Sequence, residues 1–180
     1  MIRMKKIEAV ENYTFKSSDQ LLLDTNIWLL LYGPIPSNPR VRIYSQAFKK
    51  ILEAKCQIFI DALIVSEFIN RYARIQQGVI APEIKFKAFR NSKAFKEIAC
   101  SIADDTSRVL DYCRQIDSGF ETIDMSNLLQ EYREGDSDFN DQIVSALCSN
   151  KKLILLTDDG DFKDQSIPIL TANPKLLQEI

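Results

Sequence analysis

Residues 20–26, which read QLLLDTN, place three leucines directly before an aspartate, Asp24. A short uninterrupted apolar run predicts a strand that is buried on both faces, as the strands of a parallel sheet are. Two similar runs, Gln57–Ile60 and 153–157, also end at aspartates. Segments with helical spacing separate the three runs, so the sequence predicts βαβ units and an α/β fold with helices on both faces of a mostly parallel sheet.

The remaining elements follow from hydrophobic periodicity and from helix end signals. We expect helices at 40–55, 62–76 (ending before Gly78), 126–133 and 138–150, two helices within 82–117 that break near residues 91–92 or 100–101, and short strands at 120–123 and 167–170. One domain over residues 1–180 is the expected organisation, with a helical elaboration at about 79–133.

The composition suits a folded domain with its own core, because 46% of the 180 residues are hydrophobic and 27% are charged. The longest apolar run near the N-terminus is interrupted by Asp24 and Asn26 and is too short to span a membrane. The first residues also lack a signal-peptide pattern. We therefore expect a cytoplasmic protein without membrane attachment.

The sequence contains no histidine, which excludes the usual Ser-His-Asp and Cys-His forms of nucleophilic catalysis. Four widely spaced cysteines form no C-x-x-C pair and favour buried thiols over a zinc site. The net charge of −2 gives no overall attraction to nucleic acid, so an enzyme acting on it would need a local basic patch and a bound cation. The catalytic groups of any enzyme with this sequence must therefore be carboxylates, Lys or Tyr side chains, or a metal ion held by oxygen ligands.

The acidic residues near the predicted strand ends each have an ordinary structural interpretation. Asp24 suits the N-cap of the helix that follows it, and Asp158 with Asp159 suits an Asp-Gly turn. Asp138 and Asp141 open a predicted helix, where acids satisfy exposed amides and favour the helix dipole. None of these residues by itself indicates a site.

Glu67 falls opposite the apolar face of its predicted helix, so periodicity makes it a solvated residue paired with Arg71 one turn later. As a set, however, Asp24, Glu67, Asp141 and Asp159 lie at or soon after strand ends. Sites in open parallel sheets form at the carboxyl ends of the strands. Their shared position at one edge of the sheet therefore points to chemistry.

The sequence resembles the PIN-domain ribonucleases through four motifs in order: LLLDTN at 21–26, IVSEF at 64–68, DFNDQIVSAL at 138–147 and LILLTDDGDF at 153–162. The resemblance implies a three-layer α/β/α PIN-like fold and divalent-metal-dependent cleavage of RNA. It suggests attack by water that leaves a 5′-phosphate and a 3′-hydroxyl. Proteins of this family are frequently the toxin half of a bacterial toxin–antitoxin pair, and the resemblance implies this role as well.

The resemblance carries over to particular residues. The catalytic acids are expected to be Asp24, Glu67, Asp141 and Asp159. The metal ligands are expected among Asp24, Asp138, Asp141 and Asp159, with Asp24 and Asp159 as the direct ligands and with Asp158 able to replace Asp159. Mg²⁺ or Mn²⁺ is the expected cofactor because both prefer oxygen ligands.

Substrate binding is assigned to residues beside these acids. Thr25, Asn26 and Thr157 match the small polar residues of the family motifs, and Arg71 and Arg74 share the helix face of Glu67. The two arginines are placed to hold flanking phosphates, because phosphate contacts supply most of the affinity for nucleic acid.

The expected partners are RNA, an antitoxin protein and a second copy of the chain. The basic stretch 85–96, interleaved with phenylalanines, is either a solvated helix with an aromatic core face, an RNA-contacting arm or a surface for a partner protein. The alternative for the whole chain is a catalytically inactive PIN-like module that binds RNA or protein. A haloacid-dehalogenase-like phosphatase would need a second acid where Asn26 stands.

Overall fold

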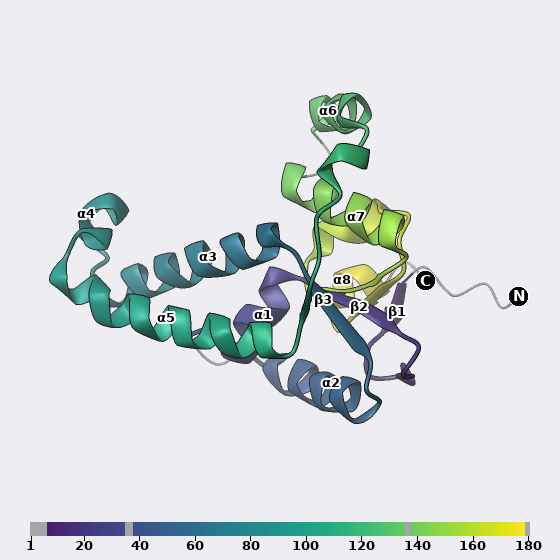
Figure 1. Ribbon diagram of the computed structural model, residues 1–180, viewed down its shortest axis with the longest axis horizontal. Helices are drawn as coiled ribbons and strands as arrows, with labels where there is room; N and C mark the ends of the chain where they lie inside the picture. Colours follow the sequence, from purple (N-terminus) through teal and green to yellow (C-terminus); the bar gives the residue numbers. More distant parts are fainter. Residues whose placement is uncertain (1–6, 35–37, 136–137, 179–180) are drawn as a thin grey trace, which may run out of the picture.

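The computed structural model describes residues 7–34, 38–135 and 138–178. At its centre lies a sheet of six strands in the order β1-β6-β5-β2-β3-β4 (Figure 1). The strands are β1 (Ile7–Ala9), β2 (Gln20–Leu23), β3 (Gln57–Ile60), β4 (Arg114–Gln115), β5 (Ile154–Leu156) and β6 (Ile169–Thr171). Every pairing in this sheet is parallel, so the predicted α/β fold is confirmed.

The QLLL run forms β2, in the middle of the sheet. Its three leucines are fully buried, and Leu22 pairs with Phe59 of β3 on one side and with Leu155 of β5 on the other. A strand with neighbours on both edges and helices over both faces has no solvated side, which explains why this run shows no polar alternation.

Helices cover the sheet on both sides: in Figure 1, α7 lies above the strands and α2 below them, which gives the predicted three layers. The helices are α1 (Thr25–Tyr32), α2 (Val41–Glu53), α3 (Ala62–Ile80), α4 (Phe86–Arg90), α5 (Lys93–Asp111), α6 (Met125–Glu134), α7 (Phe139–Lys151) and α8 (Pro174–Leu177). Aspartate side chains cap four of them, at Asp24, Asp61, Asp124 and Asp138. Asp24 and Asp61, which directly follow β2 and β3, therefore serve as N-caps, as the ordinary structural interpretation of Asp24 predicts.

Two short strands at the edges of the sheet differ from the prediction. β1 is not among the predicted strands, and β4 lies in a segment predicted to be helical. The segment 120–123, predicted as a strand, instead forms a 3₁₀ helix, η1 (Phe120–Thr122), which follows Gly119 at a φ of 68°. Edge strands of two or three residues, without fully buried side chains, carry no apolar pattern that the sequence could reveal.

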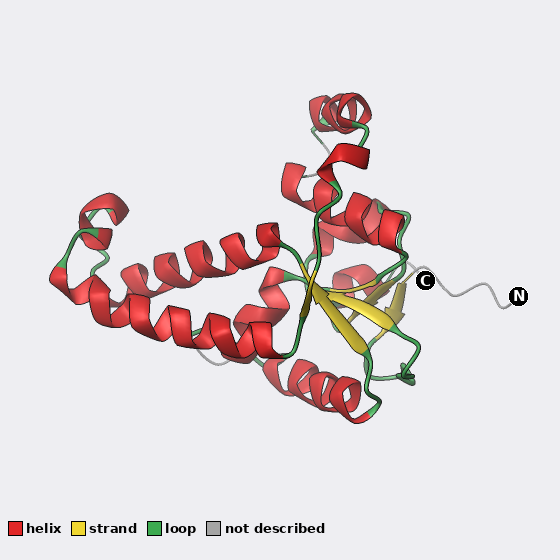
Figure 2. Ribbon diagram, in the orientation of Figure 1, coloured by secondary structure: helices red, strands yellow, loops and turns green. Residues whose placement is uncertain are grey.

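Helices α3 and α5 pack against each other and project away from the sheet, with α4 at their tip (Figure 2). Helix α3 is longer than predicted because it continues through Gly78, whose surroundings are open, and ends before Pro82, which cannot extend it. The break between α4 and α5 falls at residues 91–92, the first of the two predicted positions. There the Ser92 hydroxyl accepts a hydrogen bond from the Phe95 amide and caps α5.

Buried hydrophobic residues from Val10 to Leu176 form one contiguous cluster. No helix in the described ranges is both long and apolar enough to cross a bilayer. All four cysteines are free thiols; Cys148 is buried as predicted, whereas Cys100 is exposed on α5.

Candidate active site

The carboxyl ends of β2 and β5 bring together two stretches that lie 133 residues apart in the chain. The backbone N–H of Asp24, the first residue after β2, donates to the carbonyl of Leu156, the last residue of β5, at 3.0 Å. The loops that leave the two strands therefore meet at one edge of the sheet, where parallel sheets place their sites.

Both oxygens of the Asp24 carboxylate accept hydrogen bonds. Oδ1 accepts from the Thr25 backbone N–H, and Oδ2 accepts from Asn26 Nδ2 and from the Thr157 hydroxyl, each at 2.6 Å. The Thr157 hydroxyl in turn accepts from the backbone N–H of Asp159 at 3.0 Å. Bonds to a charged acceptor are strong, so this network fixes the orientation of the carboxylate and links it to the loop of Asp159.

The small polar residues of the motifs take two different positions. The side chain of Asn26 is half-buried and spans both loops, because its Oδ1 also accepts from the Asp158 backbone N–H at 3.1 Å. Thr25 and Thr157 have no exposed surface, and Thr25 Oγ1 makes no hydrogen bond within the described residues. The two threonines therefore line the inside of the loops and not the surface that a substrate would meet.

Burial raises the pKa of Asp24 to about 6, from an ordinary value of 3.8. The hydrogen bonds from Thr157 and Thr25 lower this pKa, whereas the negative charges of Glu67 and Asp159 raise it. Both of these acids must lie close enough to Asp24 to disfavour its charge. The charges of two other predicted catalytic residues, Glu67 and Asp159, thus act on Asp24.

Glu67 lies in the first half of α3. Its side chain is 28% exposed, and Arg71 Nη1 lies 3.0 Å from Glu67 Oε1, which confirms the predicted pairing one helical turn apart. From helical periodicity we could predict only a solvated pair of Glu67 and Arg71. Periodicity could not predict that this side of α3 faces the carboxyl edge of the sheet.

Asp141, in the first turn of α7, is the fourth predicted catalytic residue. Burial raises its pKa to about 7, and the charges of Asp24, Asp159, Asp138 and Asp161 raise it further, in decreasing order. No hydrogen bond or ion pair reaches its carboxylate from the described residues. A helix N-terminus favours negative charge, so burial and like charges outweigh the dipole at this position.

The structure separates the roles of the adjacent Asp158 and Asp159. Asp158 Oδ2 lies 3.0 Å from the guanidinium of Arg40, and Oδ1 accepts from the Tyr44 hydroxyl at 2.7 Å. Asp159 has no ion pair in the described part of the chain, and its Oδ1 accepts only from the Asp161 backbone N–H at 3.1 Å. Asp158 is therefore neutralised within the protein, and Asp159 is the more available metal ligand of the two.

Asp138 is exposed, and its carboxylate accepts a hydrogen bond from the Asn140 backbone N–H at 2.8 Å. It caps α7 and adds negative charge beside Asp141. This position is at the rim of the acid cluster formed by Asp24, Glu67, Asp141 and Asp159.

The two arginines predicted to hold phosphates each have a partner within the protein. Arg71 pairs with Glu67, as described, and the guanidinium of Arg74 lies 4.4 Å from the ring centroid of Phe86 at the start of α4. Arg74 sits about 10 Å further along the helix axis than Glu67. Contact with RNA would therefore compete with an ion pair at Arg71 and with a cation–π contact at Arg74.

The acid cluster offers only oxygen ligands, which suits Mg²⁺ and Mn²⁺. Across residues 7–34, 38–135 and 138–178, no three acidic or cysteine side chains stand close enough together to form a ready ligand group. Mg²⁺ commonly binds through one or two carboxylates and completes its shell with water and phosphate. The residues present therefore fit such an ion, and the raised pKa values of Asp24 and Asp141 mark where a cation would relieve the most repulsion.

Two hollows of opposite character lie near the carboxyl edge of the sheet. The polar hollow, of about 610 Å³, is lined by Asn26, Asp158 and Asp159 together with Lys163 and Lys175. It shares Asp159 with the acid cluster. We refer to it below as the lysine hollow.

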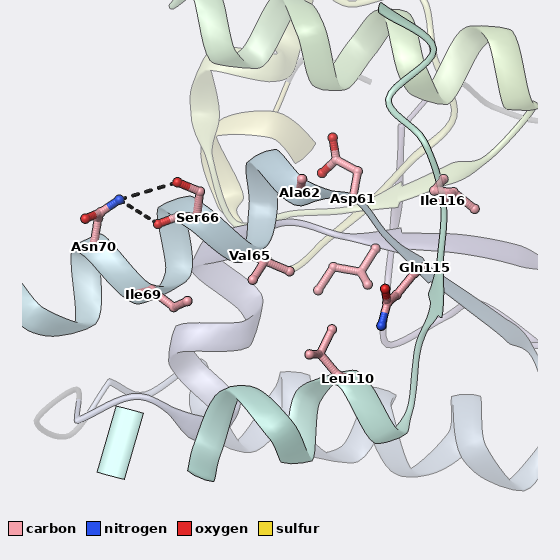
Figure 3. A pocket seen from close by; sticks show the side chains of 10 residues that line it. Asp61, Ala62, Val65, Ser66, Ile69, Asn70, Leu110, Gln115 and Ile116 are labelled. Carbon is pink, nitrogen blue, oxygen red and sulfur yellow. Dashed lines mark hydrogen bonds between the residues drawn. The ribbon is translucent and has the colours of Figure 1, made fainter. Parts of the chain in front are cut away.

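The second hollow, of about 520 Å³, is mainly apolar and lies between the start of α3 and the end of α5, where Val65, Leu110 and Ile116 line it (Figure 3). Its one acid, Asp61, is 2% exposed and caps α3 by accepting the Ile64 N–H at 3.0 Å. None of the four predicted catalytic acids lines this hollow.

Sequence reasoning missed the residues that hold the two loops in place. The Tyr44 hydroxyl lies within hydrogen-bond distance of the Thr157 carbonyl (3.2 Å) and of Asp158, and accepts from the Ala172 N–H at 2.9 Å. The buried Asn173 donates to the Asp158 carbonyl at 2.6 Å. In the sequence Tyr44 occupies an apolar helix position, so no local signal reveals what its hydroxyl does.

Comparisons with known proteins agree with this architecture. A family model described as the PIN domain matches residues 21–167. The crystal structure of VapBC2 from Rickettsia felis, bound to a DNA fragment from their promoter, is similar with a TM-score of 0.58 and 15% sequence identity, over 84% of this chain and 98% of that chain. PAE2754 from Pyrobaculum aerophilum is similar with a TM-score of 0.51 and 14% identity, over 95% of this chain and 97% of that chain. No curated protein matches the chain.

At such low identity, the similarity to these solved structures shows the fold alone. The family model is a stronger finding, because it spans most of the sequence and contains all four acid motifs within its matched range. On this ground the chain belongs to the PIN domain family.

Proposed function

We propose that the protein is a divalent-metal-dependent endoribonuclease that hydrolyses RNA phosphodiester bonds at the acid cluster. The observation that carries this proposal is that acids from three separate segments act on one another: Asp159 raises the pKa of Asp24, and both Asp24 and Asp159 raise the pKa of Asp141. A fold that brings the buried Asp24 within the influence of partly buried like charges gains nothing in stability from them, which favours a functional reason for the cluster.

Asp24 and Asp159 would hold the cation directly, and Asp141 and Glu67 would complete its surroundings. When bound, Mg²⁺ or Mn²⁺ would polarise the scissile phosphate and promote attack by water. The ion would also offset the repulsion between the acids and the phosphate. Asp138, at the exposed rim, is the second candidate for the role given to Asp141.

The other motif residues act by positioning in this proposal. Thr157 and Asn26 hold the Asp24 carboxylate in one orientation, and Thr157 connects it to the backbone of Asp159. Tyr44 and Arg40 bind Asp158 and so keep this neighbouring carboxylate out of the cluster. A preorganised site of this kind needs no rearrangement when the substrate arrives.

We further propose that the protein is the toxin half of a toxin–antitoxin pair and acts in the cytoplasm, where its RNA substrate would be. Membership of the PIN domain family and the similarity to VapBC2 support this part of the proposal. The expected partner is an antitoxin protein, and a homodimer is the expected assembly of the chain itself.

Cleavage of single-stranded RNA by the purified protein tests the proposed activity. Cleavage should require Mg²⁺ or Mn²⁺ and stop in EDTA, and Asp24→Asn or Asp159→Asn should reduce kcat by about 100-fold or more. Asp158→Asn is the matched control, because it changes the adjacent carboxylate that Arg40 and Tyr44 occupy. Undiminished cleavage in EDTA would remove the metal mechanism. RNA binding without any cleavage would support the inactive PIN-like module instead.

The toxin role has a separate test. Expression of the wild-type chain should arrest growth, the Asp159→Asn variant should not, and co-expression of a small protein encoded beside the gene should relieve the arrest. Growth arrest that is equal for wild type and Asp159→Asn would show that the effect does not come from the acid cluster.

A further inference from the structure

The lysine hollow is not explained by the acids of the proposed site. It is lined by the loop after β5 and the following 3₁₀ helix η2 (Gly160–Asp164), by Asn26 after β2, and by the start of α8. These segments meet because β2, β5 and β6 are neighbours in the sheet. The hollow therefore opens directly beside Asp159.

Two cations, Lys163 on η2 and Lys175 on α8, line this hollow together with three acids, Asp158, Asp159 and Asp161. Both lysine side chains are exposed, and neither forms an ion pair with any residue that the structure describes. By contrast, Arg40 and Arg71 each pair with a carboxylate. Among the described residues, Lys163 and Lys175 therefore offer positive charge beside Asp159 that is not held in an ion pair.

The walls of the hollow are fixed by hydrogen bonds that do not involve the ammonium groups. Asn173 Oδ1 accepts from the Lys175 backbone N–H at 3.0 Å, while its Nδ2 donates to the Asp158 carbonyl. The stem of Lys175 passes close to Gly160, where a Cβ would be in ordinary van der Waals contact with Lys175 Cδ at 3.6 Å. The backbone is thus held in place, while the charged ends of the two lysines extend from it.

We propose that the lysine hollow is a phosphate subsite, in which Lys163 and Lys175 bind a phosphodiester of the RNA strand adjacent to the one that is cleaved. This inference rests on the proposed ribonuclease function and names the residues that hold its substrate. Lysine binds phosphate as a point charge and reads no base, so the subsite contributes affinity and register without sequence preference.

Electrostatics gives the reason why such a subsite is needed. The chain carries a net charge of −2, and its acid cluster repels the backbone of the strand that it must hold. A cation in the cluster offsets this repulsion at the scissile phosphate only. Two lysines beside Asp159 would hold the next phosphate and orient the strand across the carboxyl edge of the sheet.

Binding of a labelled single-stranded RNA in EDTA, measured by fluorescence anisotropy over a salt series, tests the subsite without cleavage. Lys163→Ala and Lys175→Ala should each weaken binding at low salt by about 3- to 10-fold and reduce the log–log salt slope by about 0.7, with a loss of about 1.4 in the double variant. Lys175→Arg should keep the slope. Lys151→Ala, an exposed lysine at the end of α7, is the matched control and should change neither quantity.

In Mg²⁺, the lysine variants should raise KM with little change in kcat, because the contact is present in both the ground state and the transition state. Salt slopes equal to that of Lys151→Ala would overturn the subsite even if the protein cleaves RNA. Reduced slopes in a protein that cleaves nothing would support the subsite and refute the ribonuclease. Unchanged RNA binding with lost binding of an acidic partner peptide would overturn the subsite in favour of a protein contact.

Discussion

Replacing Asp141 by asparagine should stabilise the metal-free protein. The carboxylate has no hydrogen-bond or ion-pair partner among the described residues, and burial together with neighbouring acids raises its pKa to about 7. Asparagine keeps the shape of the side chain and removes the charge. At pH 8 Asp141 is ionised in the wild-type protein, and its partly buried charge lowers the free energy of unfolding. The asparagine variant carries no charge there, so its free energy of unfolding should be higher.

The magnitude follows from the pKa. A rise from 3.8 to about 7 is roughly 3 units, each corresponding to about 1.4 kcal/mol, which gives an upper bound of about 4 kcal/mol. The side chain is only partly buried, so water screens part of this energy. Loss of a negative charge at the N-terminus of α7 costs about 0.3–1 kcal/mol. We expect a net gain of about 1–2 kcal/mol, or roughly 3–6 °C in Tm for a chain of this size.

Thermal melts followed by circular dichroism in EDTA at pH 8 and pH 5 provide the assay. Asp138→Asn is the control, because it removes the same charge from an exposed position of the same helix and keeps a capping side chain. Its Tm should stay close to that of wild type, and the gain from Asp141→Asn should be clearly smaller at pH 5, where Asp141 is mostly protonated in the folded protein but still ionised in the unfolded chain. An Asp141→Asn variant that melts below wild type at pH 8 would refute the reasoning and make Asp141 an ordinary helix-end acid.

Four further outcomes are expected. The pKa values of Asp24 (about 6) and Asp141 (about 7) exceed the ordinary 3.8, so the folded metal-free protein binds more protons than the unfolded chain between about pH 4 and 7. Its free energy of unfolding should therefore fall as pH rises through this window, as denaturant titrations at several pH values would show. Added Mg²⁺ should raise the Tm of wild type by mass action and that of Asp141→Asn by less, and equal shifts in calorimetry would contradict an ion at the cluster. Tyr44→Phe should lower the free energy of unfolding by about 1–3 kcal/mol in urea melts, because it leaves a buried N–H and a carboxylate without their partner. Arg71→Ala and Arg74→Ala should each lower the salt slope of RNA binding by about 0.7, and unchanged slopes would show that neither arginine contacts phosphate.

The central sheet could be predicted from the sequence because its strands are buried on both faces. β2, β3 and β5 each contain three consecutive buried apolar residues, which is the pattern of a strand covered on both faces. The edge strands could not be predicted in the same way. The two residues of β4 are exposed, so hydrogen bonding to β3, and not burial, decides their conformation.

The members of the acid cluster could be named from their motifs, but their environments could not. The choice between Asp158 and Asp159 depends on Arg40 and Tyr44, which lie more than a hundred residues earlier in the chain. The spacing of α3 could show that Glu67 avoids the core but not which element its solvated face meets. Contacts between distant segments determine both the choice between the two aspartates and the surroundings of Glu67. The local periodicity of the sequence does not contain information about such contacts.

The hydrogen bond between Thr157 and Asp24 also sets the order in which the site can come into existence during synthesis. β2 is translated before its neighbour β5, and Thr157, which bonds to Asp24, follows Asp24 by 133 residues in the chain. Contacts of such long sequence separation also form late in folding, because a large loop must close first. A nascent chain that has not emerged beyond residue 159 has neither the Thr157 bond nor the Asp159 carboxylate. For the proposed ribonuclease, this order means that a nascent chain ending before residue 159 has no assembled site that could cut RNA.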